Sequence, residues 1–229
     1  ARLYAKFLVE LGIIRGTVFE ETSGSKLNDG GVAELKKILD KMLQGGGGLL
    51  FVDEAYQLEP KNNIQGKAVL NYLLTEMENY VGKIVVAFAG YYKDMDTLMA
   101  FNEGLPSRFP FKFKFDDYTD AELLSIFQSL IQNTNVRQAF KVEGGVNGLY
   151  MQIVSKRLGE ARGYPGFGNA RTVQNFWDIV QRRQTSRISR MQRLGTMSDP
   201  FELTKEDLIG PKPAKALETS EAWTKLHKM

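Results

Sequence analysis

Two adjacent carboxylates, Asp53 and Glu54, are the residues best suited to chemistry in this chain. They end an apolar run that follows four glycines, in the segment GGGGLLFVDEA. Burying an unpaired carboxylate is costly, so the pair is expected at the carboxyl end of a buried strand, where open α/β sheets bind ligands. There, one carboxylate can hold Mg²⁺ while the other orients and deprotonates an attacking water. A solvated strand end or a helix cap is the alternative interpretation.

Two arginines stand where a phosphate could approach them. Arg108 lies between Pro106 and Pro110 in a loop, and its guanidinium could stabilise a transferring phosphoryl group on its own or a neighbouring subunit. Arg171 lies at the start of a helix in the segment GNARTV. A cation is unfavourable there because the helix dipole favours negative charge at that end, so the placement makes sense if a phosphate docks beside it. The alternatives are a surface arginine in a turn and an exposed first-turn arginine that bonds an acidic neighbour.

A third group of arginines lies in the segment RRQTSRISRMQR, which has five arginines and no acidic residue. Arg183, Arg187 and Arg190 fall on one helical face beside an apolar stripe. Such a helix can bind nucleic acid or an acidic partner. The solvated face of a packed helix is the simpler interpretation, so nucleic acid is not expected as a partner.

The composition is that of an ordinary globular protein, with 43% hydrophobic and 25% charged residues among 229. The absence of cysteine excludes disulfides and thiolate metal sites, and a single histidine argues against histidine-based chemistry. A net charge of +3 is too small to indicate nucleic acid. The apolar runs are shorter than the roughly 18 residues that span a bilayer. We therefore expect an intracellular, cytoplasmic or nuclear location and no membrane partner.

The first half of the sequence alternates strand and helix patterns. A helix without a capping residue opens the chain, which suggests that sequence precedes it. The patterns then predict a strand, a polar loop over residues 23–31, a helix, the strand LLFVD, a helix and the strand KIVVAF, followed by an edge strand, FKFKF. This order predicts an α/β fold with a parallel sheet and right-handed crossovers.

The second half has helical patterns only, and the last of them follows the hinge GYPGFGN. The end of the chain has too little apolar content for a core of its own. The sequence therefore predicts an α/β core over residues 1–117, a small all-helical domain over 118–195 and a linker over 196–229.

Taken in order, the segments GGGGLLFVDEAYQL, VVAFAGY, GLPSRFP and GNAR resemble the branch of AAA+ ATPases that contains stage V sporulation protein K and red-type rubisco activase. The resemblance runs from Ala1 to about Leu194 and implies a P-loop-type parallel sheet core with a small C-terminal helical lid domain. The family's Walker A loop, G-x-x-x-x-G-K-[S/T], is not in this chain, and in the family it directly precedes the helix that Ala1 opens. The resemblance thus implies that the first strand and Walker A are missing and that this piece alone hydrolyses ATP poorly.

The resemblance also implies residue roles. Asp53 and Glu54 match the Walker B pair, with Asp53 for Mg²⁺ and Glu54 for water activation. Arg108 matches the arginine finger, which reaches the site of the next subunit in a ring. Arg171 matches sensor 2 of the lid.

Two positions depart from the family pattern. The usual sensor 1 asparagine is absent, and Tyr91 or Gly90 stands in its place. The segment SGSKLNDG falls at the pore loop that grips the client but lacks the aromatic residue of many relatives, which leaves Lys26 and Leu27 as candidates.

The leading hypothesis is an ATP- and Mg²⁺-dependent remodeller of a protein client, working beside neighbouring AAA+ modules or subunits in a ring. The tail LIGPKPAKALETSEAWTKLHKM looks like the lead-in to another module, which predicts a tandem protein. The alternative is a non-catalytic AAA+ scaffold or regulatory binding module, which the unusual sensor 1 and pore loop favour.

Overall fold

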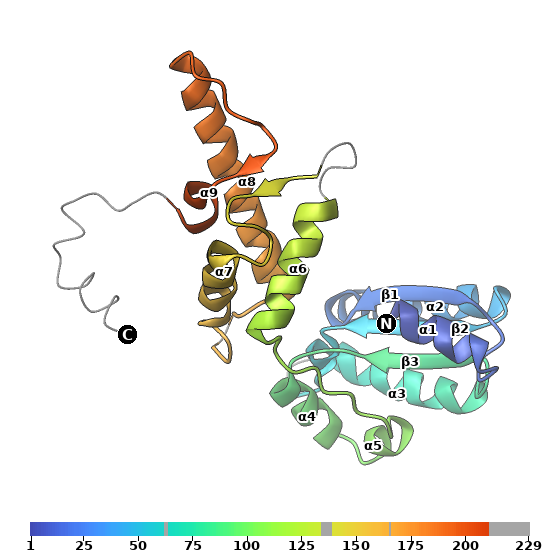
Figure 1. Cartoon of the computed structure of the whole chain (residues 1–229). Coiled ribbons are helices and arrows are strands. Elements are labelled where there is room, and N and C mark those ends of the chain that lie inside the picture. The colour runs from blue at the N-terminus through green and yellow to red at the C-terminus, as the bar shows by residue number, and fades with distance from the viewer. Residues whose placement is uncertain (62–63, 134–138, 165, 211–229) are drawn as a thin grey trace. The chain divides into compact units, whose positions relative to one another are not determined.

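The computed structural model describes residues 1–61, 64–133, 139–164 and 166–210 (Figure 1). The chain divides into two compact units, Ala1–Lys114 and Phe115–Met229. This boundary lies close to the one that the sequence predicts at residue 117.

The first unit is built on a three-stranded parallel sheet with strand order β1-β2-β3. Its strands are β1 (Val18–Ser23), β2 (Gly48–Asp53) and β3 (Ile84–Phe88). The register pairs Ser23 with Asp53 and Val52 with Phe88. Because the strands are parallel, their carboxyl ends meet at one edge of the sheet. The predicted α/β class and parallel sheet are confirmed.

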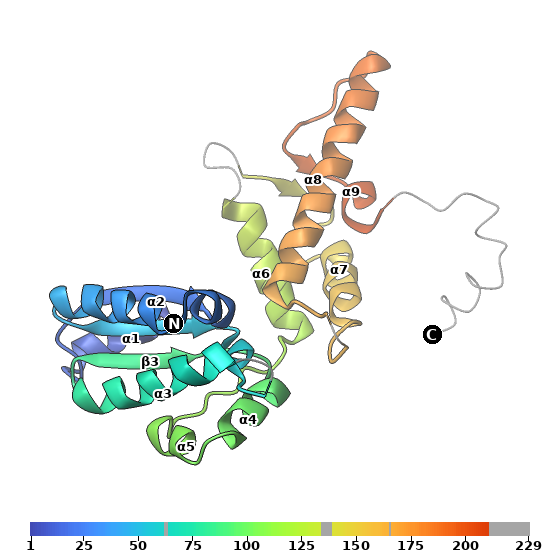
Figure 2. The same ribbon diagram turned by 180° about the vertical axis from the view of Figure 1, so that it is seen from behind.

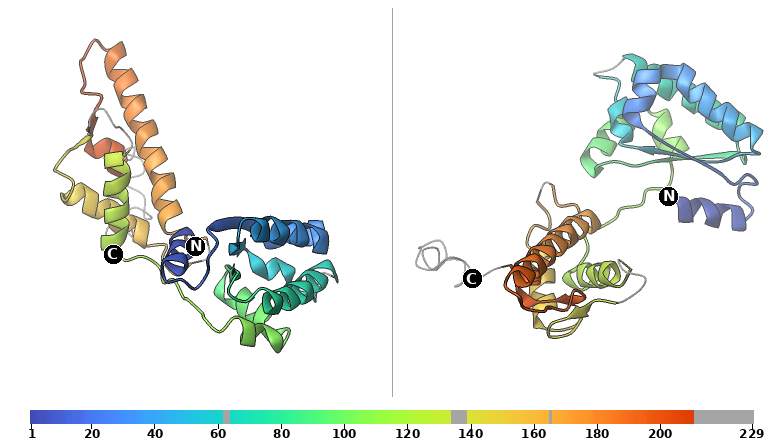
Figure 3. Two further views of the ribbon diagram at one scale, coloured as in Figure 1. Left: turned by 90° about the vertical axis from the view of Figure 1, so that its right-hand side faces the viewer. Right: turned by 90° about the horizontal axis from the view of Figure 1, so that it is seen from above.

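Helices cover both faces of this sheet (Figure 3). The unit contains α1 (Arg2–Glu10), α2 (Gly24–Gln44), the short 3₁₀ helix η1 (Ala55–Leu58), α3 (Ile64–Asn79), α4 (Tyr92–Ala100) and α5 (Gly104–Arg108). Helices α2 and α3 bury their apolar stripes against the sheet, and this main core includes Leu35, Leu39, Leu50, Val52, Leu70 and Leu73. On the other face, α1 packs Ala5 and Leu8 against Leu49. Burial of these side chains is the main force that holds the sheet and its edge in place.

The segment predicted as a polar loop over residues 23–31 is helical and forms the start of α2. Ser23 caps the helix, since its Oγ accepts a hydrogen bond from the backbone N–H of Lys26 at 3.2 Å. Gly31 then interrupts the helix with φ 59° and ψ −157°. This kink explains why regular helical spacing is visible in the sequence only from residue 32 onward.

The prediction of an edge strand at FKFKF is wrong, because this segment forms no strand in the structure. Phe111 and Phe113 lie in a segment without regular secondary structure, and both residues are exposed. The ring of Phe113 packs edge to face against that of Tyr4, with ring centroids 5.8 Å apart. A strand needs a neighbour to satisfy its backbone groups. None of the described strands pairs with this segment. Alternating phenylalanine and lysine is therefore not sufficient for a strand here.

The second unit has a core of three helices, α6 (Asp120–Asn133), α7 (Leu149–Gly159) and α8 (Ala170–Arg193). Figures 1 and 2 both show these helices side by side. Their buried side chains include Leu123, Phe127, Met151, Val154, Trp177 and Val180. This part of the unit matches the predicted helical domain.

The unit is not all-helical, and it extends beyond residue 195. A short parallel pair joins β4 (Lys141–Val142) to β5 (Glu202–Leu203), and α9 (Lys205–Ile209) follows. Leu203 and Leu208 are fully buried in the core of the unit. Residues 198–209, which we call the strap, were expected to belong to a linker because they cannot form a core alone. They instead complete the core of the helices, and residues 211–229 of the predicted linker lie outside the described residues.

Across the described ranges, we find no helix that is both long enough and apolar enough to traverse a bilayer.

Candidate functional site

The acidic pair lies where the sequence predicts, at the carboxyl end of the central strand. Asp53 is the last residue of β2, and both Asp53 and Glu54 are exposed to solvent. Glu54 has left-handed backbone angles, φ 48° and ψ 40°, which are unfavourable for a residue with a side chain. The N–H of Glu54 donates to Oδ1 of Asp53 at 3.0 Å. The chain thus turns sharply after the strand and presents two adjacent carboxylates at the sheet edge.

Backbone contacts fix this turn to the ends of the neighbouring strands. Ala89, just after β3, accepts a hydrogen bond from the N–H of Ala55 and donates one to the carbonyl of Val52, both at 2.9 Å. On the other side, Gly24 begins α2, and a Cβ on it would lie only 2.4 Å from the carbonyl oxygen of Glu54. Glycine at this position lets the β1–α2 turn approach the acidic pair closely. The three strand ends therefore form one edge around the carboxylates.

The side chain of Glu54 is held by a neighbour that the sequence analysis did not single out. Nε2 of Gln57 donates a hydrogen bond to Oε2 of Glu54 at 2.6 Å. Gln57 lies three residues later in η1, so the two side chains share one side of this short helix. The spacing E-x-x-Q was the only signal in the sequence that could have suggested this contact.

Tyr91, which the resemblance matches to sensor 1, also lies at this edge, and that role stays a prediction. It directly precedes α4, its side chain is 71% exposed, and its ring centroid is 6.1 Å from that of Tyr56. Gly90 keeps the chain close here, since a Cβ on it would be 2.8 Å from the Tyr56 ring. Burial, followed by the negative charge of Glu54, raises the pKa of the Tyr56 hydroxyl. Tyr56 is therefore neutral beside the acidic pair at physiological pH.

Arg108 does not contact the acidic pair of its own chain. It ends the short helix α5 instead of lying in a loop, and its guanidinium binds Glu78 and the carbonyl of Gly104. Glu78 is in the last turn of α3, which leads into the amino end of β3, where the N–H of Ile84 bonds the carbonyl of Tyr80. Arg108 is thus anchored to the last turn of α3, while Phe109 beside it stacks on Phe88, the last residue of β3, with ring centroids 4.4 Å apart.

Arg171 belongs to the second unit, where it is the second residue of α8 and is exposed. The residue that precedes α8 fixes this helix start. The side chain of Asn169 accepts a hydrogen bond from the N–H of Tyr118 at 2.8 Å and donates one to Asp117 at 2.7 Å. Asn169 has a positive φ of 49°, which asparagine tolerates better than most residues. The start of the helix is rigidly held while the Arg171 side chain extends into solvent.

The pore-loop prediction is wrong for Leu27. Its side chain is fully buried in the main core of the first unit because the segment is helical and turns this residue toward the sheet. A buried leucine in this conformation is not available to a client. Lys26 is exposed, and its role stays a prediction.

The arginine-rich part of α8 is more than a solvated face, because three of its arginines bind the strap. Arg187 contacts the Asp207 carboxylate at 3.0 Å, Ser198 Oγ at 2.6 Å and the Glu202 carbonyl at 2.8 Å. Arg183 donates to the carbonyls of Asp207 and Leu208, and Arg190 pairs with Glu206. These partners lie in the predicted linker, and no local sequence pattern indicates that they contact α8.

The residues at the sheet edge fit a magnesium ion that is bound together with a nucleotide. Within the described parts of the chain, no group of three or more histidine, cysteine, aspartate or glutamate side chains could hold a metal by itself. Mg²⁺ needs less from the protein, since one or two carboxylates suffice when substrate phosphates and water supply the other ligands. Asp53 and Glu54 provide that number. Their chemistry suits a shared protein–nucleotide site.

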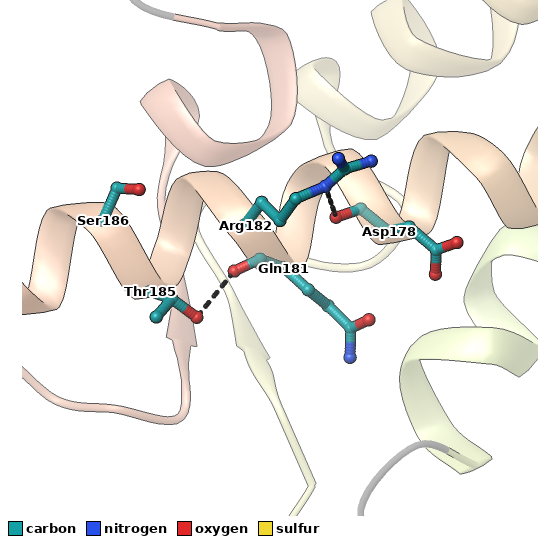
Figure 4. A pocket seen from close by; sticks show the side chains of 5 residues that line it. All are labelled: Asp178, Gln181, Arg182, Thr185 and Ser186. Atoms are coloured by element: carbon teal, nitrogen blue, oxygen red, sulfur yellow. Dashed lines mark hydrogen bonds between the residues drawn. The ribbon is translucent and has the colours of Figure 1, made fainter.

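The surface depression on α8 is a poorer candidate. Figure 4 shows its five lining residues, Asp178, Gln181, Arg182, Thr185 and Ser186, all on one side of this helix. Arg182 Nε and Thr185 Oγ1 bond carbonyl oxygens of the same helix at 3.2 and 2.9 Å. A single helix face whose polar groups bond their own backbone has no second wall to enclose a ligand.

Comparison with known proteins links both units to one family. Residues 119–219 match the AAA lid domain family. The chain is 37% identical over 166 residues to a protein CfxQ homolog of Cyanidium caldarium, covering 71% of this chain and 52% of that protein. It is 32% identical over 194 residues to the chloroplastic ribulose bisphosphate carboxylase/oxygenase activase of Cyanidioschyzon merolae, covering 82% of this chain and 62% of the activase.

A mycobacterial relative is similar over more of this chain but less of its own length. The ESX-1 secretion system protein EccA1 of Mycobacterium tuberculosis is 30% identical over 209 residues, which are 87% of this chain and 36% of EccA1. The chain therefore spans between about a third and two thirds of the relatives named here. Together with the parallel sheet and the helical second unit, these matches show that the chain is an AAA+ module of the branch that contains the CfxQ proteins and red-type rubisco activase.

Proposed function

We propose that this chain is the catalytic part of an ATP-hydrolysing AAA+ module, with Asp53 as the Mg²⁺ ligand and Glu54 as the general base. The observation that carries the proposal is the exposed acidic pair at the carboxyl end of β2, with Glu54 in left-handed backbone. Strained backbone that presents polar side chains is common at functional sites. When bound, Mg²⁺ would offset charge on the phosphates, and Glu54 would accept the proton of the attacking water.

The two arginines support a site shared between parts of an assembly. Among the described residues, Arg108 pairs with Glu78 and not with Asp53 or Glu54, which fits a role at the site of a neighbouring subunit. Arg171 extends from a fixed helix start into solvent. We assign Arg108 as the arginine finger and Arg171 as the sensor 2 residue of a ring or tandem array. Tyr91 is assigned to the nucleotide-sensing position at the sheet edge.

The wider role that we propose is remodelling of a protein client inside the cell. The names of two relatives refer to activation of ribulose bisphosphate carboxylase/oxygenase and to a secretion system. Coupled movement of the core and lid would convert the hydrolysis of ATP into force on the client. Lys26 remains a candidate for client contact, and a further module beyond the tail remains part of the proposal.

A non-catalytic scaffold or regulatory module is the second candidate. Two observations favour it: Tyr91 or Gly90 stands at the matched sensor 1 position in place of asparagine, and the segment matched to the pore loop lacks an aromatic residue. Such a module would use the same edge to bind a nucleotide or partner without turnover. The acidic pair would then have no catalytic role.

The test is ATP turnover by the natural gene product, with all sequence that flanks these residues. Glu54→Gln should lower kcat about 100- to 1,000-fold, because loss of a general base removes its contribution to the transition state. ATP affinity should be retained, since the amide keeps the size of the side chain. Exposed Glu103→Gln is the matched control and should leave kcat unchanged. Wild-type turnover equal to that of Glu54→Gln would instead support the non-catalytic candidate.

A further inference from the structure

Gln57 is tied to Glu54 twice within one turn. Its side-chain Nε2 donates to Oε2 of Glu54 at 2.6 Å, and its backbone N–H donates to the Glu54 carbonyl at 3.0 Å. The first of these bonds has a charged acceptor, which makes it stronger than a bond between neutral groups. Glu54 and Gln57 therefore form a small closed unit at the sheet edge.

The turn that carries Gln57 is well anchored, whereas the Glu54 side chain alone is not. Ala55 and Leu58 of η1 are fully buried in the main core, and Gln57 lies between them, partly buried. Glu54 is exposed, so without a partner its carboxylate would sample several rotamers. A hydrogen bond from a fixed donor restricts that freedom.

The bond occupies only one of the two carboxylate oxygens. In the described part of the chain, Oε1 of Glu54 has no hydrogen-bond partner, while Oε2 accepts from Gln57. A general base needs one free oxygen within reach of the water and a defined direction for it. The arrangement supplies both.

We propose that Gln57 is a positioning residue that orients the Glu54 carboxylate for water activation. This inference rests on the proposed function, because it gives Gln57 a role only through a catalytic Glu54. An amide nitrogen donates hydrogen bonds but accepts no proton at neutral pH, so Gln57 itself is not the base.

The first experiment tests the contact in the 229-residue chain without nucleotide. Its probe is the pair of side-chain amide NMR signals of Gln57, assigned by their loss in Gln57→Met. These signals should be shifted from free glutamine and exchange slowly with solvent. Glu54→Ala should return them to free-glutamine values, and Glu103→Ala should leave them unchanged. Free-glutamine values in the unmodified chain would overturn the proposal.

The second experiment measures ATP turnover in the natural gene product. Gln57→Met keeps the length of the side chain but removes the donor, and it should lower kcat about 10- to 100-fold because the base is misplaced. The KM for ATP should stay within about twofold, since the phosphate and metal ligands are intact. Gln57→Glu should lower kcat at least as much, because like charges repel. In a Glu54→Gln background, Gln57→Met should cause no further loss.

The outcomes separate this inference from the proposed function. If Glu54→Gln abolishes turnover while Gln57→Met and Gln57→Glu keep the wild-type kcat, the positioning role is wrong and the ATPase stands. If Glu54→Gln has no effect, both are overturned. A fall in kcat that persists in the Glu54→Gln background would show that Gln57 acts elsewhere. Thermal unfolding of each variant identifies a folding defect, and should Gln57→Met have one, Gln57→Glu decides the question.

Discussion

The acidic pair of the first unit and the ion pair that holds the strap use the same residue types in opposite ways. Asp53 and Glu54 lie exposed at the end of a strand, one of them in strained backbone. Asp207 is 1% exposed and its partner Arg187 is 10% exposed. The Asp207 carboxylate accepts hydrogen bonds from Arg187 and from both the N–H and the hydroxyl of Thr204.

This difference shows how burial separates charges that stabilise the fold from charges that stay accessible to a ligand. A buried charge is tolerated only when its hydrogen-bonding capacity is satisfied, and a satisfied group has little left to offer a ligand. An exposed carboxylate with a free oxygen costs little and remains available. The strap therefore uses its charges for stability, whereas the carboxylates at the sheet edge stay accessible for the binding and catalytic roles that we propose.

The substitution Arg187→Met in α8 should have the largest effect and tests whether the buried ion pair stabilises the second unit. Leaving Asp207 buried without its partner should lower the free energy of unfolding by about 3–5 kcal/mol. Denaturant unfolding followed by tryptophan fluorescence checks this, because Trp177 is buried in the core of the same unit. The matched control is Arg190→Met, whose pair with Glu206 is exposed and should contribute less than about 1 kcal/mol. Equal losses in the two variants would contradict the distinction.

Two substitutions at Glu54 test whether the left-handed backbone at the acidic pair is strained. Glu54→Gly should be more stable than Glu54→Ala by about 1 kcal/mol, because only glycine adopts φ 48° without steric cost. The order is the reverse of that expected in ordinary helical or extended backbone. Chemical denaturation of both variants measures the difference. If the alanine variant were the more stable, the backbone at the acidic pair would not be strained.

A smaller effect is expected at Asp199, which helps fix the strap from its exposed side. The N–H of Phe201, followed by the ammonium of Lys141, lowers the pKa of this carboxyl below its ordinary value of 3.8. A lowered folded-state pKa contributes stability above the ordinary value, and that contribution is lost as the pH falls below it. Melting temperatures recorded from neutral pH down to about pH 3 should therefore fall less steeply for Asp199→Asn than for the wild type. If the melting temperatures of the two proteins fell equally with pH, Asp199 would not contribute to the acid sensitivity of the unit.

The strands and the position of the acidic pair could be predicted from the sequence because their signals are local. GGGGLLFVD is a short apolar run between turn residues, and such a run becomes a buried strand in almost any α/β context. The three strands, the parallel sheet and the exposed carboxylates at its edge all follow from patterns of this kind. The family resemblance then pointed to the same residues.

The errors share a different cause, namely dependence on residues distant in the sequence. FKFKF has a strand pattern but no described neighbour to pair with, and Leu27 lies in a polar segment that the capping of Ser23 turns into helix. The strap looked like a linker because its two leucines fill a core built mostly by other segments.

By itself, the sequence determined the α/β class, the order of the strands along the chain and the identity of the carboxylates at their edge, since hydrophobic period and turn residues act over a few positions. Only the tertiary structure decided which charges are buried and which are free. It turned Arg187 into an anchor, left Glu54 exposed beside Gln57, and paired Arg108 with Glu78. Burial and pairing depend on what packs from elsewhere in the chain, and no local pattern contains that information.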